Sequence, residues 1–175
     1  MIFVYLYSLI AFVAYITVLV VKFRIPCSIS DSANLFKNGR IVFYLGFLNF
    51  IIPMLIYWLD KTAGQTFQFL VFLSCAALCF TAITGNYRHD KTEMKIHTIA
   101  TIICAVLSQI WIWVYIPGSY ITLPIIALAY VIGLFIPGAF RLGKDGDVVY
   151  NVNNSSIFFA EMALFIIAYV CIYIY

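Results

Sequence analysis

The chain has 175 residues, of which 65% are hydrophobic and only 10% are charged. Soluble domains carry roughly 45–50% apolar and about 25% charged residues, so this composition excludes a soluble globular domain. The net charge of +3 does not indicate a nucleic-acid partner, because in an apolar chain its meaning lies in which loops hold the charges.

The first apolar segment covers about residues 2–21, and two basic residues follow it. It is too long for a signal-peptide core and no basic residue precedes it, so we expect a retained membrane helix. Pro26 prevents that helix from continuing. Ser28 and Asp31 have the spacing of a capping box. This predicts a short helix over about 30–37 at the membrane surface.

Further apolar segments predict five more helices, over about residues 41–59, 66–85, 96–116, 121–136 and 157–175. A helix that crosses a hydrocarbon layer ~30 Å thick needs about 20 apolar residues. The polar stretch Asn86–His97 would be the central loop, with His89 to Lys95 in water. Asp145-Gly146 favours a two-residue turn, which allows a small hairpin before the last helix. We therefore predict one all-α transmembrane domain over residues 1–175, a bundle of six helices.

The basic residues divide unequally between alternate loops of this arrangement. Loops two and four contain only Lys61, whereas loops one, three and five contain Lys22, Arg24, Lys37, Arg40, Arg88, Lys91, Lys95, Arg141 and Lys144. Basic residues in short loops stay on the cytoplasmic side. The pattern predicts a multi-pass protein of the inner (cytoplasmic) membrane, with both termini outside (N-out/C-out).

Polar residues gather at the predicted cytoplasmic face. Glu161 is the only ionisable residue well inside an apolar segment, about 6 Å below that face at 1.5 Å per residue. Such residues face the bundle interior, find a partner and are candidates for function. A structural partner for Glu161, namely Arg88, Lys95 or a helix-terminus donor, is the alternative. Ser28, Ser30 and Asp31 follow the first helix at the same face, and Asp90 and His97 belong to the central loop.

Two helices also carry polar stripes at helical spacing. One stripe consists of His97, Thr101, Cys104 and Ser108, and the other of Ser74, Ala77, Thr81, Thr84 and Arg88. Small and hydroxylated residues at this spacing let membrane helices approach and hydrogen-bond. We expect the stripes to face each other or the bundle interior, chiefly for packing.

Three functions remain open from the sequence. The favoured one is a non-enzymatic membrane protein that binds or modulates a protein partner, or a second copy of the chain, through its basic loops. The second is a small membrane hydrolase with His97, Glu161, Ser28, Ser30 and Asp31 as catalytic candidates. Its metal would be zinc, held by His97, Glu161 and Asp90, but no HExxH, nucleophile elbow or CxxC is present. The third is a small transporter or ion pathway that uses Glu161 and Gln109.

The segment Pro26-Cys-Ser-Ile-Ser30 fits a P-x-S-[IL]-S pattern, and residues 69–80 and 96–111 extend the likeness. In these segments the chain resembles small multi-span membrane proteins of gut Bacteroidetes and their phages or prophages, over about its first two thirds. The resemblance implies a multi-span membrane fold and no particular activity. A more distant likeness is to the membrane hydrolases that include alkaline ceramidases and progestin/adipoQ receptors. Those combine Ser, Asp and three zinc-binding histidines on seven helices, whereas this chain has two histidines and six predicted helices.

Overall fold

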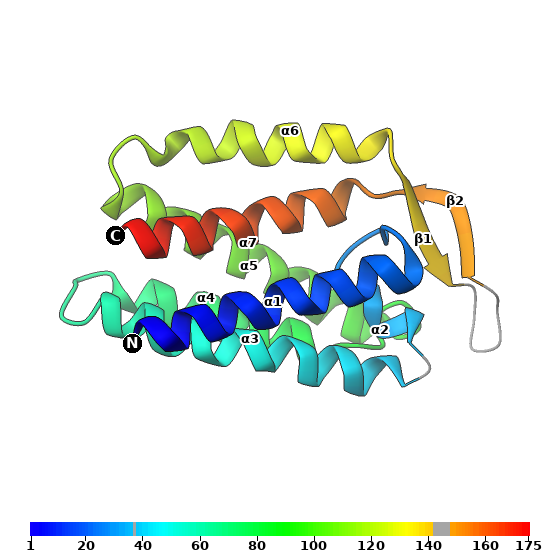
Figure 1. Ribbon diagram of the computed structural model, residues 1–175, viewed down its shortest axis with the longest axis horizontal. Helices are drawn as coiled ribbons and strands as arrows, with labels where there is room; N and C mark the ends of the chain where they lie inside the picture. The colour runs from blue at the N-terminus through cyan, green and yellow to red at the C-terminus, as the bar shows by residue number, and fades with distance from the viewer. Residues whose placement is uncertain (37, 142–147) are drawn as a thin grey trace.

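The computed structural model describes residues 1–36, 38–141 and 148–175, and helices packed side by side make up most of it (Figure 1). Every apolar segment predicted from the sequence forms a helix. These helices are α1 (Ile2–Phe23), α3 (Gly39–Lys61), α4 (Gln68–Ile83), α5 (Lys91–Tyr115), the 3₁₀ turn η1 (Ser119–Ile121) continued by α6 (Thr122–Leu134), and α7 (Ser156–Ile174). The surface helix α2 (Ser32–Leu35) is shorter than the predicted 30–37.

Within the described residues, four helices are long and apolar enough to cross a membrane, namely α1, α3, α5 and α7. The two others, α4 and the Ser119–Leu134 segment, are apolar but shorter. With 16 residues, α4 is about 24 Å long at 1.5 Å per residue, which is less than the ~30 Å hydrocarbon layer. By length and composition the chain is therefore a helical membrane protein with four candidate spans.

Helix α5 begins five residues earlier than the sequence predicts. Asp90 caps its N-terminus, because the Asp90 side chain accepts hydrogen bonds from the backbone N–H groups of Thr92 (2.7 Å) and Glu93 (3.1 Å). The prediction of a solvated loop from His89 to Lys95 is thus wrong for residues 91–95, which form the first turn of α5. His89 is exposed, as expected.

A β-hairpin joins α6 to α7. Its strands β1 (Pro137–Arg141) and β2 (Val148–Asn154) pair antiparallel, with an irregularity between Gly138 and Ala139. The predicted turn at Asp145-Gly146 lies outside the described residues. Pro26, just after α1, forms an isolated parallel bridge with Ala139, so the first connection of the chain extends this small sheet.

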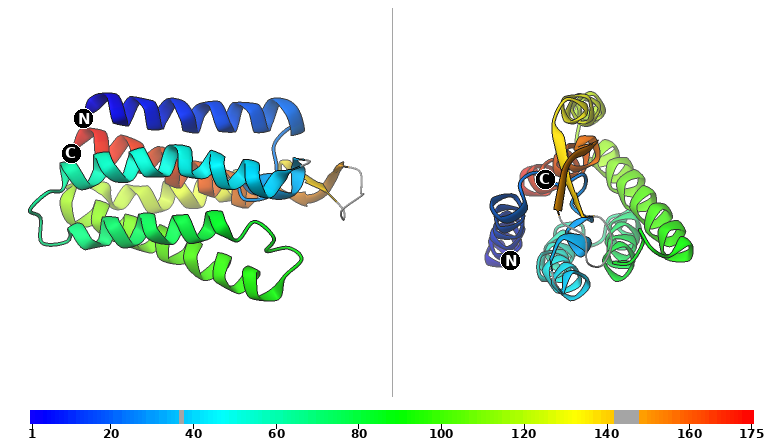
Figure 2. Two further views of the ribbon diagram at one scale, coloured as in Figure 1. Left: turned by 90° about the horizontal axis from the view of Figure 1, so that it is seen from below. Right: turned by 90° about the vertical axis from the view of Figure 1, so that its right-hand side faces the viewer.

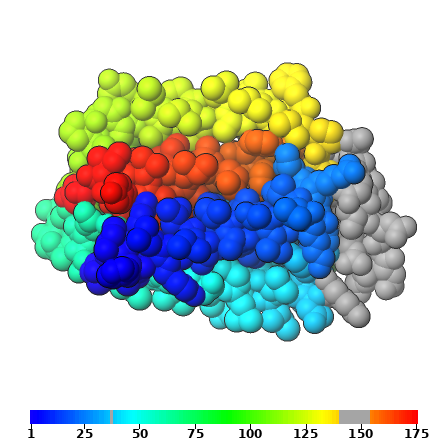
Figure 3. Space-filling model, viewed as in Figure 1, coloured from blue at the N-terminus to red at the C-terminus, as the bar shows by residue number. Residues whose placement is uncertain are grey.

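The connections between the helices lie at two opposite ends of the molecule. Both termini lie at one end of the bundle, while α2 and the hairpin lie at the other (Figure 1). α5 crosses the neighbouring helices at an angle, and its N-terminal half diverges from the bundle (Figure 2). α1, α7 and α6 lie side by side on one face (Figure 3).

Aromatic side chains fill the core between α1, α3 and α7. The rings of Phe12 and Phe50 lie 5.2 Å apart, and that of Phe165 lies 5.0 Å from Phe12. The buried hydroxyl of Ser8 links the same three helices, because it lies 2.7 Å from both the Phe50 carbonyl oxygen and the Tyr169 hydroxyl. At the end of the bundle near the termini, the indoles of Trp58 and Trp111 pack edge to face at 5.2 Å.

Candidate functional site

The loop from Ile25 to Asp31, called here the 25–31 loop, organises the end of the bundle opposite the termini. The Cys27 N–H donates to the Ala139 carbonyl (3.3 Å), and the Cys27 carbonyl accepts from the N–H of Phe158 in the first turn of α7 (3.0 Å). Two residues further, the Ile29 N–H donates to Oε2 of Glu161 (2.6 Å). The loop is therefore held against both the hairpin and α7.

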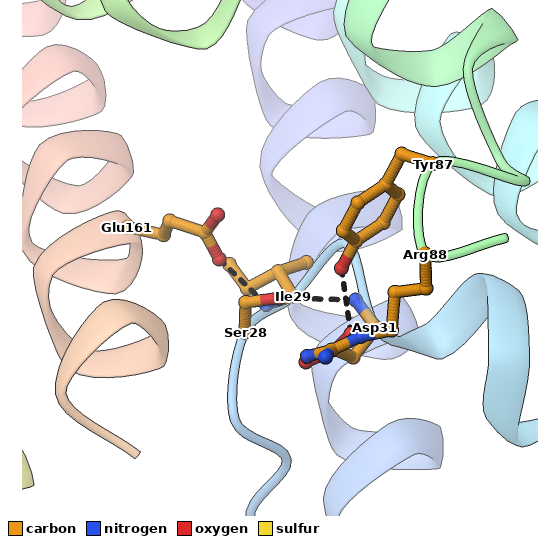
Figure 4. A network of polar contacts seen from close by, with 6 residues as sticks. All are labelled: Ser28, Ile29, Asp31, Tyr87, Arg88 and Glu161. Carbon is orange, nitrogen blue, oxygen red and sulfur yellow. Dashed lines mark hydrogen bonds and ion pairs between the residues drawn. The ribbon is translucent and has the colours of Figure 1, made fainter. Parts of the chain in front are cut away.

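Asp31 forms the polar centre of the site (Figure 4). Its carboxylate accepts from Nε of Arg88, from Nη2 of Arg88 at 2.7 Å and from the hydroxyl of Tyr87 at 2.6 Å. The Asp31 N–H donates to Oγ of Ser28 at 3.1 Å. The Ser28–Asp31 spacing thus forms one of the two hydrogen bonds of the predicted capping box.

Burial makes these charged contacts strong. Asp31 is 1% exposed. A carboxylate can be buried to this extent when it is paired with a positive charge and hydrogen-bonded. Burial alone would lower the pKa of Arg88, but the hydrogen bonds and charge of Asp31 outweigh it and raise that pKa above its usual value. Burial, followed by the charge of Asp31, raises the pKa of Tyr87, which therefore stays a hydrogen-bond donor.

His97 lies beside this network on α5. Its ring stacks on that of Tyr87 with centroids 4.1 Å apart, and its Nδ1 lies 3.0 Å from the hydroxyl of Thr84. Deeper in the bundle, Thr81 contacts Thr101 (3.4 Å), and Ser74 donates to the Cys104 carbonyl (3.0 Å). These hydrogen bonds confirm that the polar stripes of α4 and α5 face each other.

A cavity of about 560 Å³ opens at this end of the molecule. Its walls come from the 25–31 loop, the connection before α5, and α5, α6 and α7. Its charged and polar lining includes Ser28, Asp31, Tyr87, Arg88, His97 and Glu161. The structure therefore brings together four of the candidate residues that sequence analysis selected, which come from three distant parts of the chain.

A second, smaller cavity of about 60 Å³ lies inside the bundle. Ser30, the fifth catalytic candidate, lines this inner cavity rather than the larger one. Glu161 and Thr101 line both cavities, so their side chains stand between them. Trp58 lines the inner cavity from the opposite end of the bundle.

The remaining metal candidate, Asp90, lies elsewhere. It is exposed at the α5 N-terminus, where its side chain is occupied as a helix cap. Within the described ranges, no group of three His, Cys, Asp or Glu side chains is placed to hold a metal ion. The zinc hypothesis is therefore left with His97 and Glu161 alone.

Sequence reasoning missed the pairing of the charged residues. Arg88 was one of three alternative partners for Glu161, with Lys95 and a helix-terminus donor, but it pairs with Asp31, and Glu161 accepts from the backbone of Ile29. Tyr87 and Cys27 also line the cavity. Burial, followed by the charge of Asp31, raises the pKa of the Cys27 thiol to about 11. Arg88 ends one of the predicted polar stripes, but no pattern in the sequence indicates where the side chain of its neighbour Tyr87 points.

Taken together, the cavity offers one cation, two carboxylates, a histidine and hydroxyl groups at the end of an apolar bundle. Such a surface recognises a polar group by charge and hydrogen bonds. Comparisons of the chain with protein-family models, with curated proteins and with solved structures found no match.

Proposed function

We propose that the chain is a six-span protein of the inner membrane, with both termini outside. The arrangement of the helices supports this proposal. Nine of the ten basic residues fall in the predicted loops one, three and five, and the connections from α1 to α3, from α4 to α5 and from α6 to α7 lie at the end away from the termini (Figure 1). The shorter helices α4 and α6 can span a bilayer that thins locally around them. Such thinning costs fractions of a kcal/mol per Å of mismatch between helix and bilayer.

We further propose that the protein acts by binding a small polar or amphipathic molecule in the larger cavity. The observation that carries this proposal is the meeting of Ser28, Asp31, His97 and Glu161 around one space of about 560 Å³. Small-molecule sites occupy roughly 300–1,000 Å³ and combine apolar walls with a few placed polar groups. The sequence favoured a non-enzymatic protein that binds a partner through its basic loops, whereas the cavity favours a small ligand.

The hydrogen bonds favour binding over hydrolysis. A serine nucleophile needs a base within hydrogen-bond reach. Ser28 Oγ instead accepts from the Asp31 N–H, and His97 Nδ1 contacts Thr84. Across the described part of the chain, the hydrogen bonds join no histidine to a serine. Asp31 is occupied by Arg88 and Tyr87.

The inner cavity argues against an open ion pathway in this conformation. Trp58, which lines this cavity, is buried and packs edge to face on the buried Trp111. Gln109, the other residue of that hypothesis, accepts from Thr122 (2.8 Å) and lines neither cavity.

Filling the cavity tests the proposal. Thr98 lines the cavity and Ile99 does not, although both are exposed on α5. The wild-type chain, Thr98→Trp and Ile99→Trp would be purified in dodecyl maltoside from host membranes and compared by native mass spectrometry. We expect small-molecule adducts on the wild type and Ile99→Trp that Thr98→Trp lacks. Adducts on all three proteins, or on none, would contradict a binding function for this cavity.

A further inference from the structure

Helices α5 and α6 line one side of the larger cavity. Near the termini, these helices are joined through Thr122, whose hydroxyl donates to Gln109 (2.8 Å) and accepts from the Trp113 indole (3.1 Å). Toward the other end α5 diverges (Figure 2). There the cavity is lined by Ile102 of α5 and Tyr130 of α6.

Exposed, largely apolar side chains form the rim of the cavity on this side. Ile102 is 57% exposed, Tyr130 44% and Ile157, at the start of α7, 54%. α5 and α7 are long and apolar enough to cross a membrane, so lipid chains would surround this rim. An exposed apolar rim in water would be costly, whereas in a bilayer it forms a path from the lipid to the polar cavity. The ligand of such a site is an amphiphile.

The charges in the cavity select among amphiphiles. Arg88 and Asp31 pair through both carboxylate oxygens, so their charges cancel. Among the described residues no further Lys or Arg lines the cavity, so Glu161 has no basic partner there. A headgroup with net negative charge would meet two acidic side chains and, within the described part of the chain, no cation outside the Arg88–Asp31 pair, which is unfavourable. A protonated amine brings the missing positive charge and hydrogen-bond donors for Glu161 and the nearby hydroxyls.

We infer that the cavity binds a membrane lipid with a protonated amine in its headgroup, which enters sideways from the bilayer between α5 and α6. The inference rests on the proposed binding function and adds the class of ligand and its route. The amine lies toward Glu161 at the inner wall, and the acyl chains pass over Ile102 and Tyr130.

Defined lipids with the same acyl chains test this inference. Delipidated protein would be titrated with dioleoyl phosphatidylethanolamine, phosphatidylcholine, phosphatidylglycerol or dioleoylglycerol, and bound lipid measured by native mass spectrometry. We expect the ethanolamine lipid to bind about tenfold more tightly than the glycerol phospholipid, because only the former makes a charge-assisted hydrogen bond with Glu161. Choline lacks N–H donors and dioleoylglycerol lacks charge, so both should bind less tightly than ethanolamine.

A variant that removes the charge of Glu161 tests whether this residue causes the preference for the ethanolamine lipid. Glu161→Gln keeps an acceptor for the Ile29 N–H but removes the charge, and it should reduce ethanolamine-lipid binding to the level of the anionic lipid. The matched control is Glu93→Gln, because Glu93 also accepts from a backbone N–H, that of Asn86 (2.8 Å), but does not line the cavity. If Glu161→Gln fails to fold, the comparison of the four lipids on the wild type decides alone.

The outcomes separate this inference from the proposed function. Equal or tighter binding of the anionic lipid overturns the amine preference. If in that case Thr98→Trp still lacks the adducts that the wild type carries, the cavity remains a binding site, but for a ligand of another chemical class. If ethanolamine lipid binds equally to the wild type and to Thr98→Trp, it binds elsewhere, and the lateral route is wrong.

Discussion

Asp31 illustrates how one buried acid organises distant parts of the chain. It receives hydrogen bonds from Tyr87 and Arg88, which lie 56 and 57 residues later, and its own N–H binds Ser28. A two-pronged contact between guanidinium and carboxylate fixes geometry as well as charge. Removal of one partner leaves the other charge uncompensated, which is more harmful than loss of an exposed pair.

Arg88→Ala should therefore destabilise the protein. The side chain of Arg88 keeps 28% exposure, so we expect the lower end of the range for broken buried pairs, about 3 kcal/mol. For a chain of this size that lowers Tm by roughly 6–12 °C, which thermal unfolding in detergent would measure. Lys91→Ala, at an exposed position, is the control. If Arg88→Ala unfolds at the same temperature as this control, the pair does not stabilise the fold.

The thiol of Cys27 should react slowly and with an unusual pH dependence. With a pKa of about 11, only about one thiol in 1,000 is ionised at pH 8, against about a quarter for an ordinary cysteine, and the thiolate is the reactive form. Iodoacetamide labelling of a variant that retains only Cys27 should accelerate about tenfold per pH unit up to about pH 10.5. A control cysteine at exposed position 91, in a background without native cysteines, should level off above about pH 9. Levelling of both at the same pH would contradict the raised pKa.

Sequence reasoning identified the buried polar residues better than their partners. Glu161 and His97 stand out because a membrane segment tolerates few polar groups, and both line the cavity. Asp31 was identified from its place after the first helix. The partners could not be predicted, because the Asp31–Arg88 and Glu161–Ile29 contacts depend on how loops fold against each other across 57 and 132 residues.

At the scale of elements, α6 is positioned by a direct backbone contact with α7. A Cβ atom at Gly133 would lie 2.5 Å from Cα of Ser156 and 2.8 Å from the Ser155 carbonyl oxygen. Only glycine permits this approach, and close contacts of this kind are how small residues join membrane helices. Tyr130, one turn earlier on the same helix, lines the larger cavity.

Gly133→Ala should push α6 away from α7. Because the obstructing atoms are backbone and cannot rotate away, we expect overpacking of about 1–3 kcal/mol and a fall in Tm of roughly 2–12 °C. Leu134→Ala, at the neighbouring exposed position, should change Tm little. Thermal unfolding of both variants provides the measurement, and an unchanged Tm for Gly133→Ala would show that α6 is not fixed in this way.

Helix positions were predictable, but several of their ends were not. Hydropathy locates α1, α3, α4, α5, α6 and α7 because a continuous apolar segment favours a helix in lipid. The start of α5 was missed because the polar stretch Asn86–His97 was assigned to a loop, whereas Asp90 within it caps the helix. α2 is shorter than predicted, since its C-terminal residue is Leu35 and Phe36 is already extended.

At the scale of the whole molecule, the division of loops between two ends predicts their accessibility. Single cysteines would be placed at exposed positions Thr66, between α3 and α4, and Lys91, at the start of α5, in a chain without native cysteines. In spheroplasts, a membrane-impermeant maleimide should label Thr66→Cys and leave Lys91→Cys unlabelled until the membrane is opened. The reverse pattern would invert the topology, and labelling of both would contradict the six-span arrangement.

The hydrogen bond between Ile29 and Glu161 has a consequence for biosynthesis. The two residues are separated by 132 positions, which take roughly 7–26 s to translate at 5–20 residues per second. During that interval Glu161, which accepts the hydrogen bond of the Ile29 N–H, has not been synthesised, and α7 does not yet form its wall of the cavity. A nascent chain therefore has no finished site until its final helix has entered the membrane, and ribosomes that stall before α7 would release products with an incomplete cavity.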